Sequence, residues 1–90
     1  MDRTLGFLKE LVETNGAPGF EGDVAAVMAK HLKGVGPISK DRLGSFICEK
    51  VGDPKGPRVM LAGHLDEVGF LVKHVTKDGY VKFLGLGGWW

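Results

Sequence analysis

Apolar residues recur every three or four positions near the start of the chain, as they do along one face of an α-helix. The set is Leu5, Leu8, Leu11 and Val12, and charged residues occupy positions between them. This pattern predicts an amphipathic helix over residues 2–14 that begins at Asp2 or Thr4 and ends at Asn15-Gly16.

A second helical pattern follows a predicted turn at residues 16–19. Its apolar face consists of Val24, Val27, Met28 and Leu32. The predicted helix runs from about Glu21 to Lys33 and stops at Gly34. Acidic residues lie in its first turn and lysines in its last turn, which matches the direction of the helix dipole.

The second half of the chain has the shorter period of β-strands. Residues 38–41 and 46–51 are predicted strands joined by a turn. Residues 70–76 and 80–84 flank Lys77-Asp78-Gly79, and Asp-Gly between two strand-like runs is a strong hairpin signal.

The most informative stretch is a continuous apolar run, Val59-Met60-Leu61-Ala62, which Gly63 and three ionisable residues follow. Such a run is typical of a strand buried on both faces of a parallel sheet, and ligands bind at the carboxyl ends of such strands. On extended backbone His64 and Asp66 project to the same side. A carboxylate can then hold one ring nitrogen while the other binds a metal. The alternative is a hydrogen-bonded His–Asp pair that caps the strand.

The composition gives no electrostatic reason to expect nucleic acid or an anionic membrane as a partner. Lys and Arg total 12 against 11 Asp and Glu, for a formal net charge of +1 over 90 residues. Charges interrupt the N-terminal apolar residues before they reach the length of a signal peptide or a membrane span. The single cysteine, Cys48, excludes an internal disulfide and fits a reducing compartment. A cytoplasmic location is therefore expected.

Structural roles are favoured for the other residues that could carry chemistry. His31 lies near the apolar face of the second helix, His74 lies on a predicted hairpin strand, and Cys48 lies inside a strand. Trp89 and Trp90 are predicted to be packing residues, because no basic patch supports stacking on nucleic acid.

Four stretches of the chain resemble, in order, the N-terminal part of the M42 family of metallo-aminopeptidases, the glutamyl and tetrahedral aminopeptidase group. They are Ala17-Pro18-Gly19-Phe20-Glu21, Asp41-Arg42-Leu43-Gly44-Ser45-Phe46, Gly63-His64-Leu65-Asp66-Glu67-Val68-Gly69-Phe70 and Gly85-Leu86-Gly87-Gly88-Trp89. The resemblance spans essentially the whole chain. The third stretch is the specific one, since His-x-Asp-Glu-x-Gly after a buried strand is a hallmark of the family.

The resemblance implies roles for two residues. His64 would be a ligand to one of two divalent metal ions, usually zinc or cobalt, and Asp66 would be the catalytic-site carboxylate that orients its imidazole. Glu67 matches the motif without an assigned step. In the family, a metal-activated water attacks the N-terminal peptide bond of short peptides while a glutamate acts as general base.

The same resemblance implies that the chain is the opening part of a longer protein, whose remaining ligands and general base lie after Trp90. A catalytic zinc needs about three protein ligands, so the 90 residues alone are expected to be inactive. Residues 1–69 would belong to a zinc-peptidase-like α/β catalytic domain, and the hairpin of residues 70–90 would border an inserted β-rich dimerisation domain. Dimers in the family assemble into a hollow dodecamer.

Two alternatives remain open. The chain could be a non-catalytic assembly module that uses its hairpin and Trp89-Trp90 as a contact surface. It could also hydrolyse polysaccharides, since some relatives carry an endoglucanase label. Glycosidases need two carboxylates flanking one bond, whereas the adjacent Asp66 and Glu67 would point to opposite faces of extended backbone. This argues against the second alternative.

Overall fold

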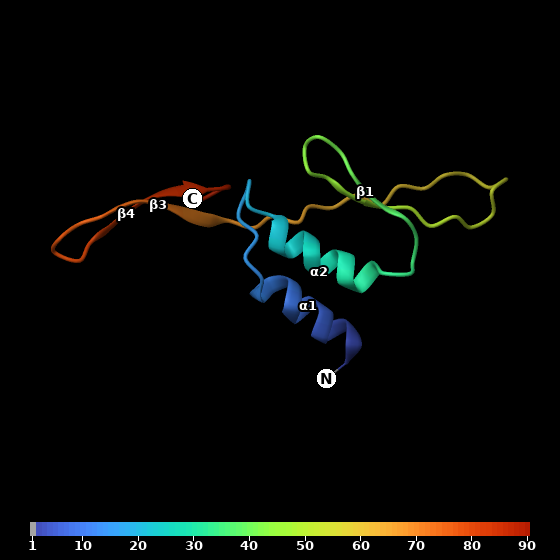
Figure 1. Ribbon diagram of the computed structural model, residues 1–90, viewed down its shortest axis with the longest axis horizontal. Coiled ribbons are helices and arrows are strands. Elements are labelled where there is room, and N and C mark those ends of the chain that lie inside the picture. Colours follow the sequence, from blue (N-terminus) through green and yellow to red (C-terminus); the bar gives the residue numbers. More distant parts are fainter. Residues whose placement is uncertain (1) are drawn as a thin grey trace.

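The computed structural model describes residues 2–90, which form an elongated body with principal extents of 64 × 35 × 23 Å (Figure 1). Its elements are α1 (Arg3–Glu13), α2 (Gly22–Leu32), β1 (Ile38–Lys40), β2 (Phe46–Cys48), β3 (Gly69–Val75) and β4 (Val81–Leu86). The radius of gyration is 17.5 Å, whereas a compact chain of this length has about 12 Å. The arrangement therefore leaves little room for a core. Neither helix of the described part is long and apolar enough to cross a membrane.

Asp2, one of the two predicted starting residues, is the N-cap of α1. Its carboxylate accepts a hydrogen bond from the backbone N–H of Thr4 at 2.7 Å, and Thr4 itself lies inside the helix. At the other end, the Thr14 hydroxyl donates to the carbonyl of Glu10 at 2.6 Å. The predicted bounds are confirmed to within a residue or so.

The loop between the helices turns where the sequence predicts. The N–H of Phe20 donates to the carbonyl of Ala17 at 2.8 Å, and the Glu21 carboxylate accepts from the N–H of Gly19 at 2.7 Å. The most buried apolar side chains belong to α2, where Val24 is 4% exposed and Ala25 is 7% exposed. The small core thus lies where α2 meets α1 and the loop before it.

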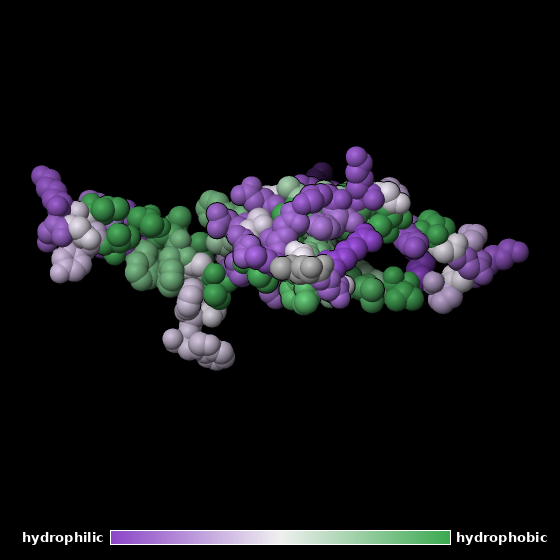
Figure 2. Space-filling model, turned by 90° about the horizontal axis from the view of Figure 1, so that it is seen from below, coloured by the Kyte–Doolittle hydropathy of each residue, from purple (hydrophilic) through white to green (hydrophobic). Residues whose placement is uncertain are grey.

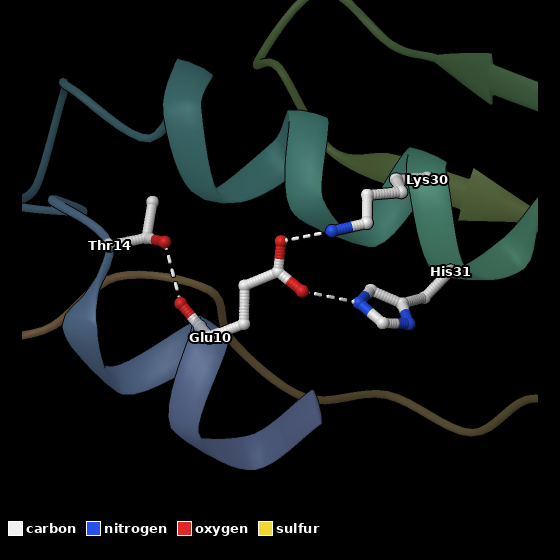
Figure 3. Close-up of polar contacts among 4 residues, drawn as sticks. All are labelled: Glu10, Thr14, Lys30 and His31. Atoms are coloured by element: carbon white, nitrogen blue, oxygen red, sulfur yellow. Dashed lines mark hydrogen bonds and ion pairs between the residues drawn. The ribbon is translucent and has the colours of Figure 1, made fainter. Parts of the chain in front are cut away.

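A polar cluster of Glu10, Lys30 and His31 joins α1 to α2 (Figure 3). The two carboxylate oxygens of Glu10 accept separately from Lys30 Nζ and from His31 Nε2, the latter at 2.7 Å. These hydrogen bonds, the one from Lys30 first, hold the pKa of Glu10 below its ordinary value. The His31 ring also packs against Phe7, with ring centroids 4.2 Å apart. The predicted structural role of His31 is confirmed.

β1 and β2 form the first predicted hairpin. In the turn, Asp41 Oδ1 accepts from the N–H groups of Leu43 and Ser45 at 2.9 and 2.8 Å. Hydrogen bonds from Ser45 lower the pKa of Asp41. β2 ends at Cys48, three residues earlier than predicted, because the next residue of the partner strand is Pro37, which has no N–H to donate.

β3 and β4 form the second predicted hairpin, which projects away from the helices (Figure 1). The N–H of Thr76 donates to the carbonyl of Tyr80 at 2.8 Å, and Gly79 has a φ of 88°. A left-handed glycine at this place in a three-residue loop matches the right-handed twist of the strands. A register shift between Val72 and His74 interrupts the strict alternation of side chains, and His74 is exposed.

The prediction of a buried central strand at Val59-Met60-Leu61-Ala62 is wrong for the described chain. Residues 57–68 have no regular secondary structure, and Leu61 is 95% exposed. The sheets formed within residues 2–90 are two antiparallel pairs, and neither includes this run. A strand buried on both faces needs a hydrogen-bonded neighbour on each edge and a covering layer on each face, and the described residues supply none of these.

Large apolar side chains are exposed along the hairpin and along the extended segment (Figure 2). On the hairpin they include Phe70, Leu71, Phe83 and Leu84. Exposed apolar surface of this extent is unusual for a protein that folds alone and marks a surface that meets another part or another chain.

Candidate functional site

The segment from His64 to Val68 connects the exposed apolar run to β3 and passes beside the loop after α1. The N–H of Glu67 donates to the carbonyl of Gly16 at 2.8 Å. Gly16 is buried, and a Cβ there would lie 3.2 Å from the Val24 side chain, so glycine permits this close approach. The segment is therefore fixed against the helical pair although it has no secondary structure of its own.

His64 and Asp66 lie in contact, as their spacing predicts. His64 Nδ1 is 3.0 Å from Asp66 Oδ1 and 2.8 Å from the backbone carbonyl oxygen of Asp66. A carbonyl oxygen can only accept, so Nδ1 must be the nitrogen that carries the hydrogen. In the neutral imidazole, Nε2 then has a free lone pair, which is the form that binds a metal.

The exposed fractions of the two side chains are consistent with an imidazole that is open to a metal and a carboxylate that supports it. The side chain of His64 is 84% exposed, while that of Asp66 is 38% exposed. A hollow beside them is lined by α1, Gly16, Val24 and residues 64–67. The imidazole thus stands at the surface, where further ligands could approach it, and the carboxylate supports it from the protein side.

The described residues do not form a complete metal site. Within residues 2–90 no three His, Cys, Asp or Glu side chains gather closely enough to hold an ion. The His64–Asp66 pair offers one donor atom, Nε2 of the imidazole, while the carboxylate holds the other ring nitrogen. This arrangement fits a single histidine ligand to a metal. A catalytic ion needs about two further protein ligands.

Asp66 and Glu67 both border the hollow beside His64. The Glu67 N–H is bonded to Gly16, and Glu67 also borders a second open hollow lined by Phe20, Phe70 and neighbouring residues, which Asp66 does not reach. No observation in the described chain gives the two carboxylates a shared bond to flank, so the polysaccharide alternative gains no support.

Of the remaining candidates, Cys48 and Trp89 pack against other residues, whereas His74 and Trp90 are exposed. The prediction that Trp90 is a packing residue is therefore wrong for the described chain. Cys48 is half-buried, with its Sγ 3.9 Å from the carbonyl of Gly36. The Trp89 indole N–H donates to the carbonyl of Gly69 at 3.0 Å, and its ring stacks on Phe70. The sequence-based reading missed the contacts that Gly16 and Gly69 make with the segment. The signal available for them was their position, since Gly69 lies inside the third stretch quoted above and Gly16 directly precedes the first.

Comparison with known proteins gives the context of this arrangement. Residues 44–90 match the family model for M42 glutamyl aminopeptidase. The chain is 40% identical over 84 residues to "Putative aminopeptidase FrvX" of Escherichia coli (strain K12), a match that covers 92% of this chain and 23% of the relative. It is 35% identical over 83 residues to "Lysyl aminopeptidase" of Pyrococcus furiosus, a match that covers 90% of this chain and 23% of the relative.

A solved structure is similar over nearly the whole chain. It is the TET aminopeptidase from the marine sediment archaeon Thaumarchaeota archaeon SCGC AB-539-E09, with a TM-score of 0.85 and 40% identity over 99% of this chain and 25% of that one. The chain thus spans about a quarter of the length of these relatives. Because the family model covers more than half of the chain, including the His64–Asp66 pair, and the fold agrees with that of an aminopeptidase, the chain belongs to the M42 peptidase family.

Proposed function

We propose that this chain is the N-terminal portion of a dinuclear metallo-aminopeptidase, in which His64 binds one of two divalent ions and Asp66 orients it. The observation that supports this most is the pairing of His64 Nδ1 with Asp66, which leaves Nε2 exposed and available. Zinc or cobalt is the proposed metal, and short peptides are the proposed substrates in a cytoplasmic enzyme.

The divalent ions would supply Lewis acidity and an activated water when bound. The contribution of this chain is to present one nitrogen in a fixed direction. The Asp66 carboxylate and carbonyl keep the hydrogen on Nδ1, fix the orientation of the ring and make Nε2 a better donor to a metal. The Gly16–Glu67 hydrogen bond holds the backbone that bears both side chains.

The rest of the chain has proposed roles in the same enzyme. Residues 1–69 would be part of the catalytic domain, where Val59–Ala62 pairs with strands that residues 2–90 do not contain. The hairpin within residues 70–90 would border the dimerisation domain, and its exposed apolar side chains would support self-association, up to a dodecamer as in the family.

Substitution of His64 in the complete protein tests this proposal. His64→Ala should lower hydrolysis of an aminoacyl-anilide by more than about 100-fold and lower the metal content, because a ligand is lost. His74→Ala is the matched control, since His74 is an exposed histidine on the nearby hairpin. Full activity and full metal content in His64→Ala would refute the assignment.

A further inference from the structure

The backbone that bears His64 and Asp66 is held at two points. The first is the Glu67–Gly16 hydrogen bond. The second is Gly69, the first residue of β3, whose carbonyl oxygen accepts the indole N–H of Trp89 at 3.0 Å. Trp89 follows β4, so the chain returns from the far end of the hairpin to the site segment.

The indole ring of Trp89 is fitted to this position. It stacks on Phe70 with ring centroids 4.5 Å apart and planes 12° apart, and Phe70 meets Phe83 edge-on at 4.4 Å. A Cβ at Gly85 would lie 2.9 Å from Trp89 Cδ1, so a residue without a side chain is required beneath the ring. The ring therefore packs against both strands of the hairpin near Gly69.

The turn before Trp89 contacts the segment as well. Gly87 has a φ of 87°, and a Cβ there would lie 3.0 Å from the Val68 side chain. Gly69 in turn lies close to Ala17, where a Cβ would be 3.1 Å from the alanine Cβ. Residues 67–69 are thus enclosed between the helical loop on one side and the end of β4 on the other.

We propose that Trp89 is a positioning residue for the metal-binding pair: by fixing the carbonyl of Gly69 it fixes Asp66, and through Asp66 the ring of His64. Gly69 is separated from Asp66 by two residues without regular structure, which is roughly 10 Å of extended backbone. Glu67, which is held by Gly16, lies between them, so the anchors at Glu67 and Gly69 together fix the course of the backbone that leads to the carboxylate. Displacements of about 1 Å are enough to reduce catalysis strongly. This inference rests on the proposed function of His64 and Asp66.

The test is Trp89→Phe in the complete protein. Phenylalanine keeps an aromatic ring on Phe70 but cannot donate to the Gly69 carbonyl. Trp90→Phe is the matched control, because it makes the same substitution at the neighbouring residue, which is exposed in residues 2–90. The quantities to measure are the dissociation constant of zinc or cobalt by competition with a chelator, kcat and KM separately, and the melting temperature.

Trp89→Phe is expected to raise the metal dissociation constant and lower kcat by roughly tenfold each, with KM and the melting temperature close to those of Trp90→Phe. Gly85→Ala should lower metal affinity and kcat in the same way, because its Cβ would displace the Trp89 ring. This variant replaces Trp89→Phe in the test if Trp89→Phe does not fold. Metal affinity and kcat equal to those of Trp90→Phe would overturn the proposal. A lower melting temperature with unchanged metal affinity would also overturn it, because it would indicate a purely structural role.

His64→Ala, measured in parallel, separates the two proposals. If His64→Ala loses metal and activity while Trp89→Phe does not, only the positioning role of Trp89 fails. If His64→Ala keeps both, the proposed function itself fails and the inference about Trp89 fails with it.

Discussion

The two helices and the extended segment of residues 57–68 differ in how far they bury their apolar side chains. α2 buries Val24 and Ala25, whereas the apolar residues Leu5, Leu8 and Val12 of α1 are 53–59% exposed. Val59, Met60 and Leu61 of the extended segment are 81–95% exposed. Both regions contain several large apolar residues in the sequence. The difference is that a helix satisfies its own backbone, whereas a strand needs partners from elsewhere.

This difference separates what a short chain can complete from what it cannot. The helices, the Asp41 turn and the β3–β4 hairpin are closed by contacts between residues close in sequence or across one loop. The segment before His64 has no such partner in residues 2–90, although it leads directly into the candidate site. The site therefore lies where local structure ends and long-range structure is needed.

The largest effect is expected from a substitution in the apolar segment before His64, because that segment needs long-range partners. Leu61→Asp in the complete protein should lower the free energy of unfolding by about 3 kcal/mol or more, because the proposed pairing of Val59–Ala62 with strands outside residues 2–90 would bury the charge. In the 90-residue chain the same change should leave the circular-dichroism spectrum unaltered, since Leu61 is 95% exposed there.

Leu43→Asp is the matched comparison, because Leu43 is equally exposed but lies in the turn of the local β1–β2 hairpin. It should change the unfolding free energy by no more than about 0.5 kcal/mol in either form. If Leu61→Asp were equally harmless in the complete protein, Val59–Ala62 would not be a buried strand in any context.

The sequence predicted the parts of the fold that depend on local rules. Asp2 as a cap, Gly79 in its loop and the pairing of His64 with Asp66 all follow from residues within a few positions of each other. The environment of Val59–Ala62 did not follow, because burial of a strand depends on distant segments. Nor did the Trp89–Gly69 hydrogen bond, which joins residues 20 positions apart.

A smaller effect is expected at the cluster that joins the helices. The pKa of Glu10 is below its ordinary value of 4.5 because Lys30, and then His31, donate to its charged form. The stability that it contributes is therefore fully present above about pH 4.5 and is lost as the pH falls through the lowered pKa. Glu10→Gln should remove this part of the acid sensitivity.

Thermal unfolding followed by helix content checks this prediction at several pH values. The variant should melt slightly below the wild type near neutral pH, and the two curves should converge as the solution becomes acidic. Curves that stay parallel down to the acid limit would show that Glu10 contributes nothing through its charge.

The central claim is that Asp66 holds Nδ1 of His64 so that Nε2 can bind a metal. The measurement that tests it most directly is the affinity of the complete protein for zinc or cobalt after Asp66→Asn, a change that keeps the shape of the side chain and removes its charge. We expect affinity to fall by about 10- to 100-fold with the fold retained. Unchanged affinity in a folded Asp66→Asn protein would contradict the account.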